Sequence, residues 1–190
     1  MNTRKNSFKA LIVAGSLALA TMTMGASYVF ATTPSAAPQS QLDFAAHLDS
    51  QVRHEIATLP YYGVFDYLEF QVTGTEVRLT GAVVNPVTKS DAAGAVKHIA
   101  GVTRVVNDVT VLPLSNFDDR TRRAEYRSIF SAGPLTRYSM GVNPAIHIIV
   151  DNGHVTLEGV VRSEADRDLA AIRANSVPGV FSVTNNLRAE

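Results

Sequence analysis

Three arginines in the middle of the chain have a spacing that gives them a common direction. Arg120, Arg123 and Arg127 stand at positions i, i+3 and i+7 of the segment DDRTRRAEYR. In a helix this spacing places all three side chains on one face, and Asp118 and Asp119 suit the positive end of the helix dipole. Such a face would bind lipid phosphates or an acidic partner, since each basic residue near an anionic membrane contributes about 1 kcal/mol. The alternative is a solvated helix face with local ion pairs.

A segment shortly after the arginines mixes apolar, aromatic and basic side chains, namely Leu135, Arg137, Tyr138 and Met140. Amphipathic side chains of this kind suit the interface of a bilayer. They suit a lid over the domain's own core equally well. The three arginines of the helix face and these four residues are the candidates for contact with lipid or with a protein partner.

The other polar residues form no recognisable catalytic or metal-binding pattern. The histidines include no pair at the one-turn spacing of a helical metal site, and H-E-x-x-H, G-x-S-x-G and the phosphate-binding loops are missing. His147 and His154 would lie on one hairpin and could face each other, although two solvated strand residues is the simpler interpretation. Zero cysteine excludes disulfides and thiolate ligands. We therefore expect no enzyme, no cofactor, no metal and no small-molecule substrate.

The elements that carry these residues occur twice. At a fixed offset of 78 residues, 13 positions between Gly63 and Val109 are identical to their counterparts further along the chain. The identities are mostly apolar residues and glycines, so the repeated feature is a core with its turns. Two copies of one small module favour a binding or scaffolding protein.

Periodicity predicts the same order of elements in both copies. Alternating apolar residues mark strands, and apolar residues about four apart mark helices. The sequence predicts an α+β fold of two tandem α-β-β-α-β modules. Each would be a three-stranded mixed sheet with two helices on one face, because a strand–helix–strand crossover makes the joined strands parallel. The expected elements are 42–59, 68–72, 77–83, 88–99 and 105–111 in the first module, and 120–132, 146–150, 155–161, 163–177 and 183–187 in the second.

Four glycines recur at matching places and are assigned structural roles. Gly81 and Gly159 interrupt the second strand of each module, where glycine marks a bulge or a close backbone approach. We expect a helix to pack tightly there. Gly101 and Gly179 are expected to end the second helix of each module.

The first residues differ in composition from the rest of the chain. A basic start, an uncharged run, and small or apolar residues at 29 and 31, three and one positions before a cut, predict a signal peptide over 1–31. The proline-containing 32–41 predicts a flexible linker. The alternative is an uncleaved anchor helix, because the run is long enough to span a bilayer. The two domains would then cover 42–112 and 118–190.

We predict that the exported protein lacks residues 1–31 and is soluble outside the cytoplasm. The intact mass of the exported protein checks this prediction. A mass that still includes Met1 to Ala31, or recovery in the membrane fraction alone, would establish the anchor instead.

The balance of basic and acidic residues limits the kinds of partner that the protein can bind. The whole chain has 17 basic and 17 acidic residues, and removing the three basic residues of the signal peptide leaves 14 against 17, a net charge of −3. This balance argues against a general nucleic-acid binder, which needs a basic surface. Residues 41–112 carry 5 basic and 8 acidic residues, whereas 113–190 carry 9 of each, so we expect the second module to make the membrane contact.

Two motifs resemble those of the BON domain family (bacterial OsmY and nodulation). They are V-x-L-x-G-x-V at 77–83 and 155–161, followed by G-V-x-x-V-x-N at 101–107 and 179–185. Two copies behind a signal peptide are similar to double-BON proteins of the periplasm. The resemblance covers essentially all of the chain after the linker and departs in the longer loop 133–143.

The resemblance implies a periplasmic, non-enzymatic protein that associates with anionic phospholipid surfaces and acts in envelope integrity or stress. The alternative is a module that binds another envelope protein or peptidoglycan without touching lipid.

Overall fold

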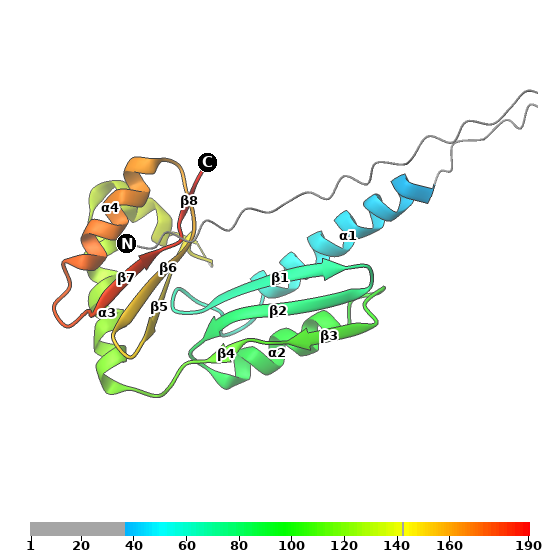
Figure 1. The fold of residues 1–190 in the computed structure, drawn as a ribbon, viewed down its shortest axis with the longest axis horizontal. Coiled ribbons are helices and arrows are strands. Elements are labelled where there is room, and N and C mark those ends of the chain that lie inside the picture. The colour runs from blue at the N-terminus through cyan, green and yellow to red at the C-terminus, as the bar shows by residue number, and fades with distance from the viewer. Residues whose placement is uncertain (1–36, 142) are drawn as a thin grey trace, which may run out of the picture. The chain divides into compact units, whose positions relative to one another are not determined.

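The computed structural model of the protein describes residues 37–141 and 143–190, and Figure 1 shows their fold. The predicted signal peptide and the first part of the predicted linker lie outside this range. The chain from Ala36 to Glu190 forms one compact unit. Within the described residues, no helix has both the length and the apolar character needed to cross a membrane.

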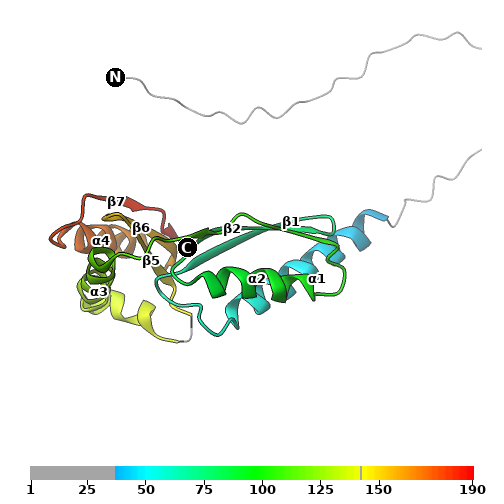
Figure 2. The same ribbon diagram turned by 90° about the horizontal axis from the view of Figure 1, so that it is seen from below.

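The first module is built around one central strand. Its elements are α1 (Ala37–Ala57), β1 (Tyr67–Thr73), β2 (Glu76–Val83), α2 (Pro86–Lys97), β3 (Arg104–Asn107) and β4 (Thr110–Val111). Strand β2 pairs antiparallel with β1 and parallel with β3 and β4, and both helices lie on the same side of this sheet (Figure 2). The predicted third strand is therefore present as two short pieces on the same edge of β2.

The second module repeats this arrangement and adds a short 3₁₀ helix. Its elements are α3 (Asn116–Phe130), the 3₁₀ helix η1 (Gly133–Ser139), β5 (Ile146–Asp151), β6 (His154–Val161), α4 (Glu164–Asn175), β7 (Ser182–Asn185) and β8 (Arg188–Ala189). Strand β6 is central, antiparallel to β5 and parallel to β7 and β8. The α+β prediction with two tandem modules is confirmed.

Side-chain caps set the start of three helices. The side chains of Asn85, Ser115 and Ser163 accept hydrogen bonds from backbone N–H groups in the first turns of α2, α3 and α4. Pro86 follows Asn85 at the first helical position, where its missing N–H costs nothing. Helix α2 therefore begins two residues before the predicted start at 88.

Helix α1 begins earlier than the sequence predicts. It starts at Ala37, so the flexible linker expected over 32–41 is wrong for residues 37–41. The physical reason is the position of Pro38. A proline in the first helical turn removes only an N–H that has no partner within the helix, so it does not interrupt the helix.

Each module has its own apolar core. In the first, Leu48 and Val52 of α1 and Val96 of α2 are buried with Leu79 and Val83 of β2. In the second, the core joins α3, η1 and α4 to β5 and β6, and its members include Ile129, Leu135, Ile148, Leu157 and Ala170. Each helix pair thus buries its apolar face against one side of its own sheet.

The mid-strand glycines have a different neighbour from the one expected. A Cβ at Gly81 would lie 2.1 Å from the carbonyl oxygen of Tyr67, and a Cβ at Gly159 would lie 2.1 Å from that of Ala145. The expectation of a tightly packed helix is wrong, because the close approach is made by the backbone at the start of the neighbouring strand.

Gly101 and Gly179 lie past the helices that they were expected to end. Helix α2 ends at Lys97 and α4 ends at Asn175, so each glycine stands four positions further on. Both glycines lie in the turn that leads to the third strand. A Cβ at Gly101 would lie 2.7 Å from the ring of Phe44, which explains why a residue without a side chain stands there.

The outer edge of β5 is closed by contacts from two other segments. The backbone N–H of Ile148 donates to the carbonyl of Val64 in the first module at 2.7 Å. The carbonyl of Val150 accepts a hydrogen bond from the Arg122 guanidinium, also at 2.7 Å. A strand edge with free N–H and C=O groups is a template for pairing with other chains, so these contacts protect the second sheet.

Candidate functional site

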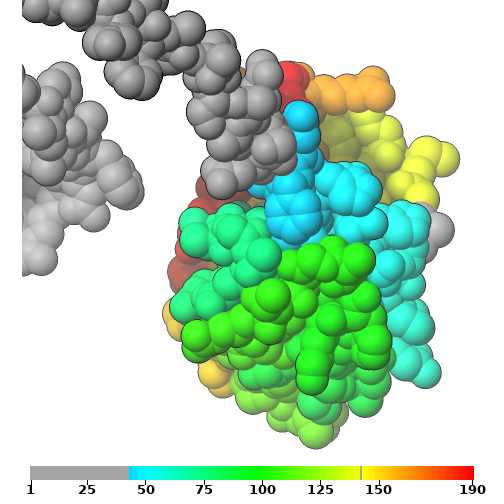
Figure 3. All heavy atoms as spheres, turned by 90° about the vertical axis from the view of Figure 1, so that its right-hand side faces the viewer, coloured from blue at the N-terminus to red at the C-terminus, as the bar shows by residue number. Residues whose placement is uncertain are grey.

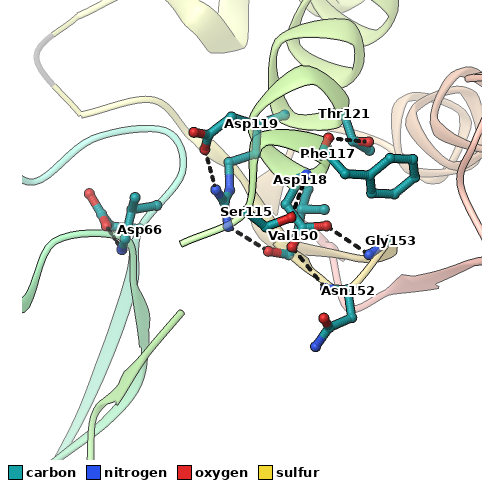
Figure 4. Close-up of polar contacts among 11 residues, drawn as sticks. Asp66, Ser115, Phe117, Asp118, Asp119, Thr121, Val150, Asn152 and Gly153 are labelled. Carbon is teal, nitrogen blue, oxygen red and sulfur yellow. Dashed lines mark hydrogen bonds and ion pairs between the residues drawn. The ribbon is translucent and has the colours of Figure 1, made fainter. Parts of the chain in front are cut away.

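A buried carboxylate fixes the start of α3 against the sheet of the second module. Asp118 is fully buried, and its carboxylate accepts hydrogen bonds from the N–H groups of Gly153 at 2.8 Å and Asn152 at 3.1 Å (Figure 4). The side chain of Ser115 caps the same end of the helix. These bonds define which side of α3 faces the core and which faces solvent.

One arginine of the basic segment belongs to the core side. Arg122 is 3% exposed, its Nη1 donates to Asp119 Oδ1 at 2.6 Å, and its Nη2 reaches the edge of β5. Its role is structural, because its hydrogen bonds are spent on the protein itself.

The other three arginines lie on the opposite side of α3. Arg120, Arg123 and Arg127 are exposed, and no ion pair joins any of them to a carboxylate within the described part of the chain. We call these three residues the arginine stripe. A helix face with three such cations is a candidate for contact with an anionic surface.

Two of the other candidates are core residues. Leu135 and Tyr138 of η1 are buried, and the Tyr138 hydroxyl donates to Asp166 Oδ2 at 2.6 Å and accepts from the Arg162 N–H at 2.9 Å. Burial raises the pKa of Tyr138. The expectation that these two side chains contact lipid or a partner is wrong, since residues three apart in a 3₁₀ helix point the same way, here into the core.

The remaining two candidates are exposed, one on η1 and the other directly after it. Met140 is 72% exposed. Arg137 is also exposed, its Nε donates to the carbonyl of Pro134 at 2.7 Å, and its guanidinium lies over the Tyr138 ring. The segment is thus a lid over the domain's core with two solvent-facing side chains.

A hollow of about 320 Å³ lies beside the arginine stripe. Arg123, Tyr126 and Arg127 of α3 line it together with Val64 and Phe65. The rings of Phe65 and Tyr126 are 6.4 Å apart in an edge-on arrangement. Apolar walls with two guanidinium groups match an amphiphile that has an anionic head. No sequence pattern indicates this hollow, because it needs a loop of the first module beside a helix of the second.

His147 is a buried contact residue that sequence reasoning assigned to solvent. Its ring lies 5.4 Å from that of Tyr62 and 5.6 Å from that of Tyr67. Burial lowers its pKa. In the β5–β6 register His147 stands opposite Glu158, whereas His154 stands opposite Asp151, so the two histidines do not face each other.

Glu125 is the most unusual titratable group of the module. It is fully buried on α3, and neither carboxylate oxygen has a hydrogen-bond partner within the described structure. Burial raises its pKa to about 8. A buried group with a raised pKa links its protonation to the stability of the fold.

No group of three or more histidine, cysteine, aspartate or glutamate residues in the described ranges is placed to hold a metal ion.

Comparison with known proteins assigns both modules. The family model of the BON domain matches residues 45–113 and 118–190. No curated protein matches the chain.

Two solved structures of CdsD, a structural protein of the type III secretion system of Chlamydia trachomatis, are also similar. The first, of its C-terminal domain, shares 15% identity over 75% of this chain and 97% of that one, with a TM-score of 0.27. The second shares 13% identity over 76% of this chain and 93% of that one, with a TM-score of 0.29.

Proposed function

Because the chain belongs to the BON domain family, a family of non-catalytic binding domains of the bacterial envelope, we propose that it binds the anionic phospholipid surface of the envelope from the periplasm. The second module makes the contact, and the bound protein supports envelope integrity under stress. The observation that carries this proposal is the arginine stripe.

The local electrostatics support the second module as the contact. Its 9 basic residues balance its 9 acidic residues, whereas the first module has a net charge of −3 over 41–112. The most negative part of α3 is also turned away from the stripe, since Asp118 is buried and Asp119 pairs with Arg122. The attraction is reversible and weakens as salt screens it.

We expect the triple substitution Arg120→Ser, Arg123→Ser and Arg127→Ser to weaken binding to anionic vesicles about a hundredfold. Three basic residues at about 1 kcal/mol each amount to roughly two decades in affinity. Co-sedimentation with phosphatidylglycerol-containing vesicles, and with phosphatidylcholine vesicles for comparison, measures the effect. Circular dichroism checks that the variant is folded.

The first module supplies a control with the same change in charge. Arg53, Arg78 and Arg104 are exposed and pair with Asp49, Asp108 and Glu76. Serine at all three positions should leave binding unchanged. If both triple variants lose the same affinity for anionic vesicles, the net charge of the protein determines binding and the position of the arginines does not. If wild type binds no vesicles at all, an envelope protein becomes the leading partner.

A further inference from the structure

The second module exposes large apolar side chains at one end. Leu114 is 95% exposed, Phe181 is 72% exposed and Phe117 is 38% exposed. The rings of Phe117 and Phe181 are stacked 6.2 Å apart with an interplanar angle of 22°. Phe117 belongs to the first turn of α3, directly beside the β5–β6 turn (Figure 4), and Phe181 precedes β7. We call these three residues the apolar tip.

The backbone around the tip leaves space for its rings. A Cβ at Gly153 would lie 2.7 Å from the Phe181 ring and 3.1 Å from the Phe117 ring. A Cβ at Gly179 would lie 3.4 Å from Phe117. The two phenylalanines therefore sit on a glycine-lined shelf and keep their outer faces in solvent.

The first module shows what the same place looks like without this feature. At the repeat offset of 78, Gly153 corresponds to Thr75 and Phe181 corresponds to Thr103. The hydroxyl groups of Thr75 and Thr103 are hydrogen-bonded at 2.7 Å. The first module thus has a pair of hydroxyl groups at the place where the second module exposes an aromatic ring. The fold itself therefore does not require Phe181. Figure 3 shows the first module as spheres, seen from the side that lies at the right of Figure 1.

The charged residues near the apolar tip indicate which kind of surface it contacts. Arg120 follows Phe117 by three residues and begins the arginine stripe. Asp118 is turned inward, and the exposed Asp151 of the nearby turn accepts a hydrogen bond from the Asn152 side chain. Exposed aromatic and aliphatic side chains next to a row of arginines match the acyl boundary and the headgroups of an anionic bilayer.

We infer that the apolar tip inserts into the interfacial region of an anionic bilayer while the arginine stripe contacts the headgroups. This inference rests on the proposed function and adds to it. The arginines give a salt-sensitive attraction, and the tip gives an apolar contribution that salt does not screen. Roughly tenfold in affinity is expected from each phenylalanine, about half of what full burial of the side chain gives.

Depth of insertion can be measured directly because the chain has no tryptophan. Phe181→Trp introduces one reporter at the tip, and Ile172→Trp, at a 64% exposed position of α4, is the matched control. A chain that begins at Thr32 keeps every described residue and is mixed with vesicles of equal parts phosphatidylcholine and phosphatidylglycerol. We expect the emission of the tip reporter to shift to the blue and to be quenched by lipids brominated along the acyl chain. The control reporter should change in neither respect.

A second variant separates insertion from electrostatic attachment. Phe181→Ser removes an exposed ring, so the protein should keep its stability in urea while its residual vesicle binding at high salt falls about tenfold. Bound protein whose tip reporter is neither shifted nor quenched overturns the inference and leaves the proposed function standing. No binding of wild type to these vesicles overturns both. A tip reporter that changes only with an added envelope protein would assign the tip to a protein partner instead.

Discussion

Replacing Gly159 with alanine is expected to lower the free energy of unfolding by about 3 kcal/mol. Gly159 has φ +125°, a backbone conformation that residues with a side chain rarely adopt. The new Cβ would also lie 2.1 Å from the carbonyl oxygen of Ala145, an atom that already accepts a hydrogen bond from Val160. Strain in the backbone and a collision with a fixed atom add together. Urea unfolding measures the loss, and Gly81→Ala should behave alike because it has φ +111° and the same clash.

Gly94 provides the matched control for this substitution. It lies within α2, and a Cβ there would meet nothing within 4 Å. Gly94→Ala should raise the free energy of unfolding by roughly 0.5–1 kcal/mol, because alanine favours the helix and restricts the unfolded chain. If alanine is tolerated equally well at 94 and 159, the strand must shift at no cost, and the explanation from the Ala145 carbonyl is wrong.

Stability should fall as the pH rises from neutral to weakly alkaline values, because of Glu125. An ordinary glutamate loses its proton near pH 4.5, whereas burial raises the pKa of Glu125 to about 8. Between these values the folded protein holds a proton that the unfolded chain has released, so each pH unit costs up to about 1.4 kcal/mol. The penalty is absent below pH 4.5 and constant above about 8.

The best window for this measurement lies between pH 6.5 and 8. His147 has a lowered pKa, so its burial makes stability fall toward acid below its ordinary value of 6.5 and opposes the Glu125 effect there. Urea unfolding of wild type should lose about 2 kcal/mol across the window. Glu125→Gln should abolish the slope, whereas Glu164→Gln at an exposed position of α4 should keep it. A slope that survives in Glu125→Gln would assign the effect to another group.

The fold was readable from the sequence because its signals are local. Alternation of apolar residues in the strands and the four-residue spacing of apolar residues in the helices each depend on a few neighbouring residues, and the repeat showed that the same order of elements occurs twice. The start of α1 was not readable, because Pro38 reads as part of a flexible linker but occupies the first helical turn, where proline is tolerated.

The candidate site was only partly readable. Helical spacing was enough to place Arg120, Arg123 and Arg127 on one side of α3. Leu135 and Tyr138 looked equally suited to membrane or core, because a short apolar segment carries no information about what covers it. The hollow beside Phe65 and the shelf beneath Phe181 depend on contacts between distant segments, which periodicity does not encode.

The closed edge of β5 has a consequence for how such proteins evolve. A gene fragment that encodes only the second module would leave the Ile148 N–H without the Val64 carbonyl and would uncover the ring of His147. In the isolated second module, the outer edge of β5 would be free to pair with β5 of another copy. We therefore expect recombination to move these two repeats together as an inherited pair, although each has a complete sheet and core of its own.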